Sequence, residues 1–386
     1  MKAATMVRGM TATTLVESAR SVSEEIRVNA DEGERIRRLP EPSVQVLAEA
    51  GLMKMCVPEV YGGPEADPMT VVDAIAEVAR ADGGAGWCTM IASTTSTMAA
   101  FLPPAVAEKI YGPADSITGG VAAPNGVGVA ARADGVDGWT VTGRWPWGSG
   151  TQHSQWILGG ARCDGAWKFC FFPRSEVTFH DTWHTGGMRG SGSLDYSVDA
   201  TFVPEDHTLT IGAMTRYVDN RLSRFPNFTL LATGVAAVGL GVARRALDEL
   251  VDIAQGKRPQ FSAKTLAKSA FTQIEVAKAE SAWRAARSFL LDELSQAWDL
   301  TAAGQPVPVE QRVGIRLAGV HAAATCTWVA DSAYTLAGGT AVYDSSVLGR
   351  CLRDAHVVTQ HIQTAPKLNE SLGKSLLGVT VDDTMF

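Results

Sequence analysis

The first part of the chain, to about residue 115, carries apolar residues at steps of three and four. Between residues 41 and 52 these positions are Val44, Leu47, Ala48 and Leu52. Such spacing places the side chains on one face of a helix. Further along, Asp67 stands directly before Pro68, as an N-cap residue does before a proline at the first helical position. The pattern predicts an N-terminal helical domain over residues 1–115.

The middle of the chain, residues 116–215, is dominated by Gly, Thr, Val and Trp. Its short apolar runs are Trp139–Thr142, Trp156–Leu158, Trp167–Phe172 and Leu194–Val203. Asp-Gly pairs at 137–138 and 164–165 separate some of these runs, and such pairs favour the tight turns of β-hairpins. We therefore expect a small antiparallel β domain.

Residues 216–386 return to helical spacing. The segment Ala263–Trp298 contains no Pro or Gly, and as one helix it would be about 50 Å long at roughly 1.5 Å per residue. Comparable helices are predicted over Thr229–Ala254 and Val309–Leu336, with another after Arg350. The fold class is thus α+β: a helical domain, a β domain, and a C-terminal bundle of long helices.

Composition narrows the class of protein. The 386 residues are 46% hydrophobic and 19% charged, which is enough apolar surface to build a large core and excludes a mainly disordered chain. The net charge is −7, and the sequence contains no run of Lys and Arg. A nucleic-acid-binding protein usually carries a basic stripe, so we expect no nucleic-acid partner.

The sequence also argues against a membrane or secreted protein. Its longest apolar run, residues 229–243, holds three glycines and is shorter than the roughly 20 residues that a membrane helix needs. The N-terminus lacks a continuous apolar stretch before a small-residue cleavage site. The cysteines are scattered, with no C-x-x-C pair. We expect a cytoplasmic protein with no metal site.

Four segments together resemble one known superfamily. They are Gly143–Gly150 (GRWPWGSG), Trp183–Ser193 (WHTGGMRGSGS), Gly338-Gly339 and Arg353–His356 (RDAH) followed by His361. With the order of helices, β domain and bundle, the whole chain resembles the acyl-CoA dehydrogenase fold. Within it, the chain is similar to the flavin-dependent monooxygenase branch, which includes the oxygenase components of p-hydroxyphenylacetate and secosteroid phenol hydroxylases, and dibenzothiophene monooxygenase.

A missing carboxylate favours that branch over the dehydrogenases. Many acyl-CoA dehydrogenases carry a Glu in this C-terminal stretch that removes the α-proton of the thioester. Alignment on Arg353-Asp354 places Ser345 at that position. A serine hydroxyl accepts no proton at neutral pH without a base of its own. Asp344 is one residue out of phase, which on a helix turns it about 100° away.

The resemblance implies the oxygenase component of a two-component flavin monooxygenase. Such a protein takes reduced flavin (FMNH2 or FADH2) from a separate NAD(P)H-dependent flavin reductase. O2 then adds at C4a of the flavin, and the resulting hydroperoxide hydroxylates a small aromatic or polycyclic substrate such as a phenol or an indole. The family also implies a homo-oligomer, a tetramer, and the long helices offer broad apolar faces for it.

The same resemblance assigns two catalytic residues. Ser149 is placed near the N5 and C4a edge of the flavin, where its hydroxyl can hydrogen-bond the oxygen adduct. His361 is placed on the opposite side, as a base toward a substrate hydroxyl or as a partner of the peroxide. A neutral imidazole suits this role because its pKa lies near the working pH. The alternatives are a turn residue for Ser149 and a helix-end cap or surface residue for His361.

Other residues are implied to bind the flavin. Trp147 would wall the isoalloxazine, and the loop at Pro124-Asn125 would pass its pyrimidine side. Arg258, expected at the start of the long helix, resembles the arginine that meets the flavin phosphate of a neighbouring subunit. The alternative for Arg258 is a solvated helix-end charge. Gly338 and Gly339 would allow the backbone to approach the cofactor closely.

The substrate is expected between the N-terminal domain and His361. Trp87, in a G-W motif, and Thr95, in the Ser/Thr-rich stretch that follows, are the candidate substrate-binding residues beside His361. The alternative for the Ser/Thr-rich stretch is a helix surface. Several members of the branch carry a further His after this motif, and here that His is missing. A simple phenol is therefore less strongly implied than an indole, a polycyclic ring, a heteroatom or a larger phenol.

Two other functions stay open at this point. One is an FAD-dependent dehydrogenase of the acyl-CoA type whose base lies elsewhere in the chain. The other is a non-catalytic scaffold that only binds flavin or a partner.

Overall fold

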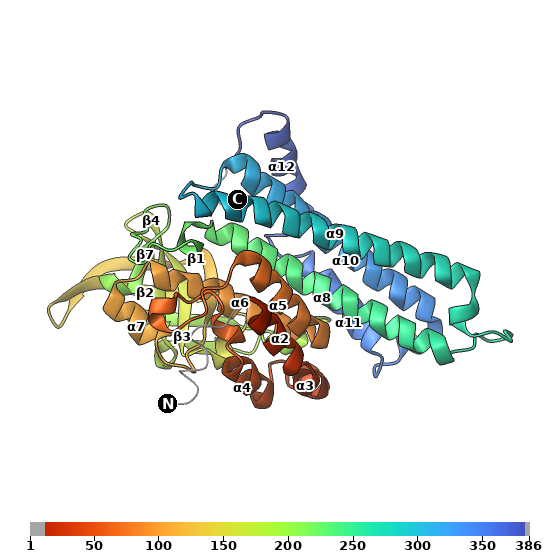
Figure 1. Cartoon of the computed structure of the whole chain (residues 1–386). Coiled ribbons are helices and arrows are strands. Elements are labelled where there is room, and N and C mark those ends of the chain that lie inside the picture. The colour runs from red at the N-terminus through yellow and green to blue at the C-terminus, as the bar shows by residue number, and fades with distance from the viewer. Residues whose placement is uncertain (1–11, 383–386) are drawn as a thin grey trace.

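The computed structural model describes residues 12–382, and its elements follow the predicted order of helices, sheet and bundle (Figure 1). The N-terminal helices are α2 (Ala12–Ser21), α3 (Ser23–Ile36), α4 (Glu41–Glu49), α5 (Pro68–Ala81), α6 (Gly83–Ser96) and α7 (Pro104–Tyr111). The predicted cap is confirmed, because the Asp67 side chain accepts a hydrogen bond from the backbone N–H of Thr70 at 3.0 Å. This cap fixes the start of α5.

The sheet has seven strands in the order β5-β6-β2-β1-β3-β4-β7. The strands are β1 (Thr118–Ala133), β2 (Val136–Trp145), β3 (Trp156–Cys163), β4 (Ala166–Pro173), β5 (Thr178–His180), β6 (Asp195–Pro204) and β7 (Thr208–Thr210). The prediction of a purely antiparallel domain is wrong in one pair, since β1 and β3 are parallel. The cause is the segment 146–155, which passes the first residues of β1, so that β3 begins beside Thr118 and runs parallel to β1.

The C-terminal bundle is formed by α8 (Asn227–Gly256), α9 (Ala270–Ala302), α10 (Val309–Ala337), α11 (Val347–Val358) and α12 (Leu368–Leu376). The first residue predicted for the helix over residues 263–298 is wrong. The helix begins only at Ala270, where the Ser269 side chain caps it by accepting from the N–H of Thr272. Its 33 residues span about 50 Å at 1.5 Å per residue.

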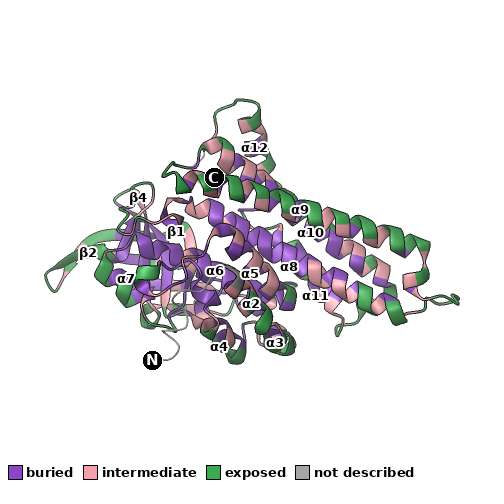
Figure 2. Cartoon of the chain, in the orientation of Figure 1, coloured by how far each residue is buried: buried purple, intermediate pink, exposed green. Residues whose placement is uncertain are grey.

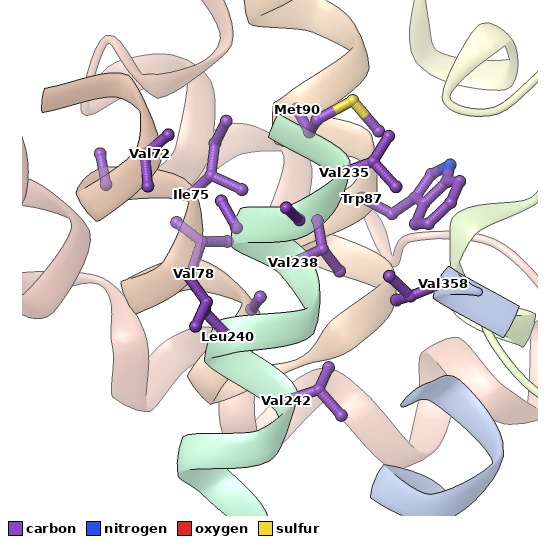
Figure 3. Packing of buried hydrophobic residues seen from close by; sticks show 14 of the residues in the cluster. Val72, Ile75, Val78, Trp87, Met90, Val235, Val238, Leu240, Val242 and Val358 are labelled. Carbon is purple, nitrogen blue, oxygen red and sulfur yellow. The ribbon is translucent and has the colours of Figure 1, made fainter. Parts of the chain in front are cut away.

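Helix α8 runs through the middle of the molecule and is buried over most of its length (Figures 1 and 2). Val235, Val238 and Val242 of α8 pack against α5 and α6 (Figure 3). A Cβ at Gly241 would lie 2.3 Å from the carbonyl oxygen of Ala76, so glycine is needed where α8 meets α5.

Burial accounts for the hydropathy of the two most apolar helices. The segments Asn227–Gly256 and Val309–Val342 are long and apolar enough to cross a membrane, yet 83% and 67% of their most apolar windows are buried inside the protein. Their apolar surface therefore serves the core that holds the sheet, the N-terminal helices and the bundle together.

Candidate active site

The structure brings together three of the predicted site residues from three parts of the chain. Trp87 lies on α6, Ser149 on the segment between β2 and β3, and His361 after α11. The indole Nε1–H of Trp87 donates to the Ser149 hydroxyl at 2.9 Å. The Trp87 and His361 rings meet edge to face, with centroids 5.5 Å apart. Trp87 is thus the contact that joins the two candidate catalytic residues.

Ser149 is the first of three serine hydroxyls that form a hydrogen-bonded chain. Its Oγ lies 2.6 Å from the Oγ of Ser193, which lies 2.6 Å from the Oγ of Ser191. Ser191 donates to the backbone carbonyl of Met188 at 2.7 Å. Each hydroxyl has one proton and two lone pairs, so the bonds run in one direction, from Trp87 to Met188. Ser149 accepts from Trp87, donates to Ser193 and keeps one lone pair for the N–H of a ligand.

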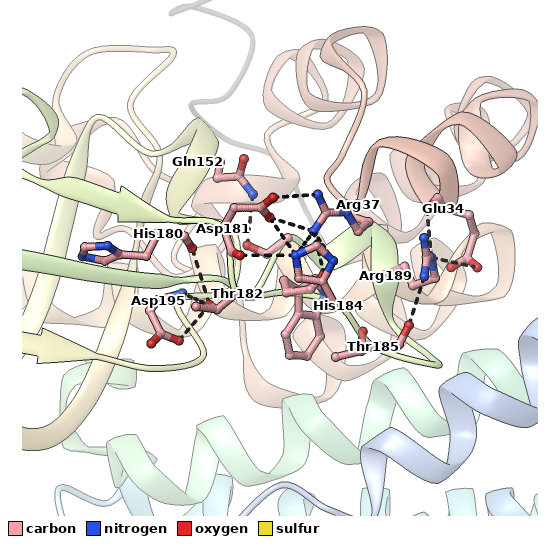
Figure 4. Close-up of polar contacts among 12 residues, drawn as sticks. Glu34, Arg37, Gln152, His180, Asp181, Thr182, His184, Thr185, Arg189 and Asp195 are labelled. Atoms are coloured by element: carbon pink, nitrogen blue, oxygen red, sulfur yellow. Dashed lines mark hydrogen bonds and ion pairs between the residues drawn. The ribbon is translucent and has the colours of Figure 1, made fainter.

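The loop 181–193, which carries Ser191 and Ser193, forms hydrogen bonds on its outer side. Arg37 donates to both carboxylate oxygens of Asp181, at 2.7 and 3.0 Å (Figure 4). Arg189 donates to the carbonyl oxygen of Glu34 at 3.0 Å. These contacts tie residues 181–193 to the helix α3, so the hydroxyl chain is held in place from both sides.

On its inner side, the loop is held by a buried carboxylate. Asp354 of α11 accepts a hydrogen bond from the backbone N–H of Met188 at 2.5 Å. Met188 has a φ of +50°, which is uncommon for a residue other than glycine. Burial raises the pKa of Asp354 to about 7 and also raises that of Asp82 nearby, while the positive charge of Arg350 opposes both shifts.

His361 is held in a defined protonation state. Burial, together with the positive charge of Arg316, lowers the pKa of His361 to about 4. The ring is therefore neutral at pH 7, in the form that was expected, although its pKa lies below the working pH. The backbone N–H of Gln363 donates to Nδ1 of His361 at 3.2 Å. Nδ1 is thus the acceptor, so the ring proton lies on Nε2, which becomes a donor.

A cavity of about 410 Å³ lies beside this cluster. Ile91, Thr94 and Thr95 of α6 line it, and they follow Trp87 by four, seven and eight residues, so they share its helical face. Residues from the sheet and from α8 close the cavity, and most of them are apolar: Leu158, Phe169, Ile211, Phe228 and Leu231. Thr95, which was predicted to bind the substrate, thus lines the cavity.

A second cluster, distant from the first, holds Arg258, predicted to meet the flavin phosphate, and Gly338 and Gly339, predicted to allow close approach to the cofactor. Arg258 follows the last residue of α8, Gly256, and is exposed, so its predicted place at the start of the long helix is wrong. The neighbouring Lys257 donates to the carbonyl oxygen of Ala337, which places Arg258 near Gly338 and Gly339. Trp87 packs by Val235 (Figure 3), and Gly256 lies roughly 30 Å further along α8 at 1.5 Å per residue.

The remaining flavin candidates lie on strand β1 and just after the end of strand β2. Trp147 is 70% exposed, and its carbonyl oxygen accepts from the N–H of Ser149 at 2.8 Å. Pro124 and Asn125 belong to strand β1 and not to a loop, which corrects the prediction. They lie where the pairing of β1 with β3 shifts register, between Val121 and Gly126. Such an irregularity accommodates the missing N–H of a proline.

These features fit a flavin in two halves. The lone pair of Ser149 and the exposed face of Trp147 suit the flat ring. At the bundle end, the cation of Arg258 and the backbone of Gly339, beside which a Cβ would meet no atom within 4 Å, suit a phosphate. In the part of the chain that the structure describes, no group of three or more His, Cys, Asp and Glu side chains could hold a metal ion.

Comparison with known proteins identifies the family. Two family models match, described as "Acyl-CoA dehydrogenase, N-terminal domain" over residues 11–109 and "Acyl-CoA dehydrogenase, C-terminal domain" over residues 233–366. The indole-3-acetate monooxygenase of Pseudomonas putida is 33% identical, covering 91% of this chain and 90% of the relative. The oxygenase subunit HsaA of a flavin-dependent monooxygenase from Rhodococcus jostii is 31% identical, covering 93% and 97%. The chain belongs to the flavin-dependent monooxygenases of the acyl-CoA dehydrogenase superfamily.

Solved structures of this monooxygenase family agree with the assignment. The 3-HSA hydroxylase from Rhodococcus sp. RHA1 superposes with a TM-score of 0.89 at 30% identity, covering 96% of this chain and 98% of that one. The similarity to named flavin-dependent oxygenase components extends over nearly the whole chain, so the expected fold, enzyme class and use of reduced flavin with O2 are confirmed.

Some residues of this monooxygenase site were not predicted from the sequence. Arg312 lines the cavity and Arg316 lies behind it, both on α10. Ser191 and Ser193 complete the hydroxyl chain. The sequence signal for the serines was present in the segment GSGS, but the signal for the arginines was only a helical spacing of four, which many exposed pairs share.

Proposed function

We propose that the protein is the oxygenase component of a two-component system that hydroxylates an aromatic substrate with reduced flavin and O2. The observation that carries the proposal is the contact of Trp87 with both Ser149 and His361, beside an apolar cavity. Relatives named for indole-3-acetate and p-hydroxyphenylacetate oxidation support an aromatic substrate. As an oxygenase component, the protein depends on a separate flavin reductase.

The residues of this site have complementary roles in the proposal. Bound reduced flavin supplies the electrons for O2 activation. Ser149, which accepts from Trp87 and donates to Ser193, would use its remaining lone pair to accept a hydrogen bond from the flavin. His361 would donate a hydrogen bond from Nε2–H to the reacting group, because its Nδ1 accepts from the N–H of Gln363. The apolar walls of the cavity hold the aromatic ring and exclude water.

Rapid mixing tests this function. The protein, loaded anaerobically with reduced FMN or FAD, is mixed with oxygenated buffer, and the flavin absorbance is followed. We expect a delay between consumption of O2 and the return of oxidised flavin, because the buried site excludes water from the activated oxygen. Immediate oxidation at the rate of free flavin would refute the proposal and return attention to the dehydrogenase alternative.

The second cluster leads us to propose a homotetramer in which two chains share each flavin. The roughly 30 Å along α8 between Trp87 and Arg258 prevents one chain from using both clusters for the same ring and phosphate. Large apolar side chains are exposed on the bundle at Phe271, Ile274 and Trp328. Such exposed apolar surface is typical of an interface between subunits.

Complementation between variants tests shared sites. Ser149→Ala and Arg258→Ala chains are each expected to be poorly active, because each lacks one half of the flavin site. In co-expressed mixed oligomers about one site in four combines the two intact halves by random assembly, so activity should return to about that fraction. Arg132→Ala, which changes an exposed arginine of the β1–β2 hairpin, serves as the control. Mixed oligomers no more active than their parents would contradict sharing.

A further inference from the structure

Arg316 of α10 is a cation inside the protein core. Its side chain is 1% exposed, and burial lowers the pKa of its guanidinium to about 10, so the group stays protonated at pH 7. Among the residues that the structure describes, no carboxylate opposes this shift. A buried charge without an opposite charge beside it is costly to keep, which makes Arg316 a candidate for a role beyond packing.

The hydrogen bonds of Arg316 lead to the turn that carries His361. Its Nη1 donates to the side-chain oxygen of Gln363, a residue that is buried as well. The backbone N–H of Gln363 in turn donates to Nδ1 of His361 at 3.2 Å. Gln363 therefore links the guanidinium to the imidazole, because α10 holds its side chain while its backbone holds the ring.

Arg316 joins this turn to the wall of the cavity. The other hydrogen bonds of the turn are local, such as that from the Thr364 hydroxyl to the carbonyl oxygen of Val358 at 2.6 Å. Arg316 comes from a different helix, and it also donates to the carbonyl oxygen of Phe228 at 3.5 Å. Phe228 lines the cavity at the start of α8. The position of the turn relative to the cavity thus depends in part on Arg316.

The charge of Arg316 acts on His361 in the same direction as burial. Both lower the pKa of His361, and no other charged group of residues 12–382 contributes to the shift. Trp87, which touches the ring, is uncharged, and Arg312, one helical turn before Arg316, has a partner of its own within the protein. The hydrogen bond and the charge therefore favour the same state, a neutral ring with its proton on Nε2.

We propose that Arg316 is a positioning residue for His361, which it holds through Gln363 with the ring proton on Nε2. This inference rests on the proposed function, in which Nε2–H of His361 is the donor to the reacting group. A hydrogen-bonded partner behind a histidine selects which ring nitrogen carries the proton. The role explains why a charge is kept in the core at this point of α10.

Nuclear magnetic resonance of the oligomeric protein, labelled in its histidines and free of flavin and substrate, tests this role. The ring resonances of His361, identified by their loss in His361→Ala, report its tautomer and its titration. We expect the wild-type ring to be the Nε2–H tautomer alone at pH 7. Arg316→Met should give a mixture of both tautomers and move the titration upward by about one pH unit, the lower end of the effect of a nearby charge.

Two further variants separate the charge from the hydrogen bond. Arg316→Lys keeps the charge and one donor, so the titration should stay low and the Nε2–H tautomer should be partly restored. Gln363→Glu keeps the backbone donor but adds an opposite charge, so the tautomer should persist while the titration moves upward. In turnover, Arg316→Met should lower the product formed per oxidised flavin about tenfold, similar to the loss of partners that orient metal-bound histidines.

The control is an arginine of the bundle outside the site. Arg244→Met removes a half-buried cation of α8 that pairs with Glu280 at 2.6 Å, and it should change neither the tautomer nor the titration of His361. Unchanged resonances in Arg316→Met and Gln363→Glu would overturn the proposal, and so would equal changes in Arg244→Met. If Arg316→Met does not fold, Arg316→Lys and Gln363→Glu decide. Because the resonances are recorded without flavin, failure here is distinguishable from failure of the monooxygenase function.

Discussion

Replacing His361 with alanine is expected to lower the product formed per flavin oxidised by about 10²–10⁴-fold, the usual contribution of a positioned proton-transfer group. The reason is geometric, since His361 meets Trp87 at 5.5 Å and presents Nε2–H as a donor. Flavin oxidation should continue, with peroxide replacing hydroxylated product. The measurement is the ratio of product to oxidised flavin at saturating substrate.

A second substitution separates a donor from a base. His361→Gln places an amide N–H near the position of Nε2, so it should restore part of the product yield if His361 donates a hydrogen bond. It should restore nothing if His361 removes a proton. His356 is the matched control, because it lies on the same segment but is exposed and hydrogen-bonds Asp331 at 3.1 Å. His356→Ala should leave the yield unchanged.

The pH dependence follows from the same contacts. Because burial lowers the pKa of His361 to about 4, the neutral donor form predominates above pH 5, and half of it is lost only when the pH falls to about 4. The product yield of the wild-type protein, plotted against pH, should therefore show no inflection near pH 6.5 that is due to His361. The profile of His361→Ala is the reference for this comparison. Such an inflection would indicate an imidazole that titrates normally and would contradict the assignment of a buried donor.

The sequence predicted the order of elements because local patterns determine them. Helical spacing in residues 41–52 and the Asp67 cap depend on near neighbours, and the cap was confirmed. The parallel pairing of β1 with β3 depends on a crossing of the sheet, which no local pattern encodes. The late start of α9 at Ala270 depends on the cap at Ser269, one of several serines in that region.

Candidate-site residues within long sequence motifs were predicted, whereas residues without such a motif were missed. The segments around Ser149 and His361 each matched several positions of the family pattern, and the structure joins them through Trp87. Arg258 was predicted at the start of the long helix, although it lies just after the end of α8. The sequence of a loop between two helices does not show which of the two helices a residue lies next to. Arg316 was not predicted, because its hydrogen bonds to Phe228 and Gln363 are tertiary contacts that no local pattern shows.

The last prediction concerns the carboxylate that supports the hydroxyl chain. Asp354→Ala leaves the buried N–H of Met188 without an acceptor, which should cost about 1–3 kcal/mol of unfolding free energy. It should also lower the product yield, because Met188 with its positive φ would relax and displace Ser191, Ser193 and Ser149. Asp354→Asn keeps an oxygen acceptor and should preserve the yield. Urea midpoints and yields measured on the same samples test both statements.

The direction in which stability changes with pH distinguishes both Asp354 variants from the wild-type protein. The folded pKa of Asp354, about 7, lies above the usual value of 3.8, so between pH 4 and 7 the unfolded chain has released a proton that the folded protein keeps. Wild-type stability should therefore fall as the pH rises through this window, by at most about 1.4 kcal/mol per pH unit from this group. Asp354→Asn removes the slope and should be at least as stable as wild type at pH 8, whereas the exposed control Asp344→Asn keeps the slope. Equal loss of yield in Asp354→Ala and Asp354→Asn would show that the charge, and not the acceptor, holds the serine chain in place.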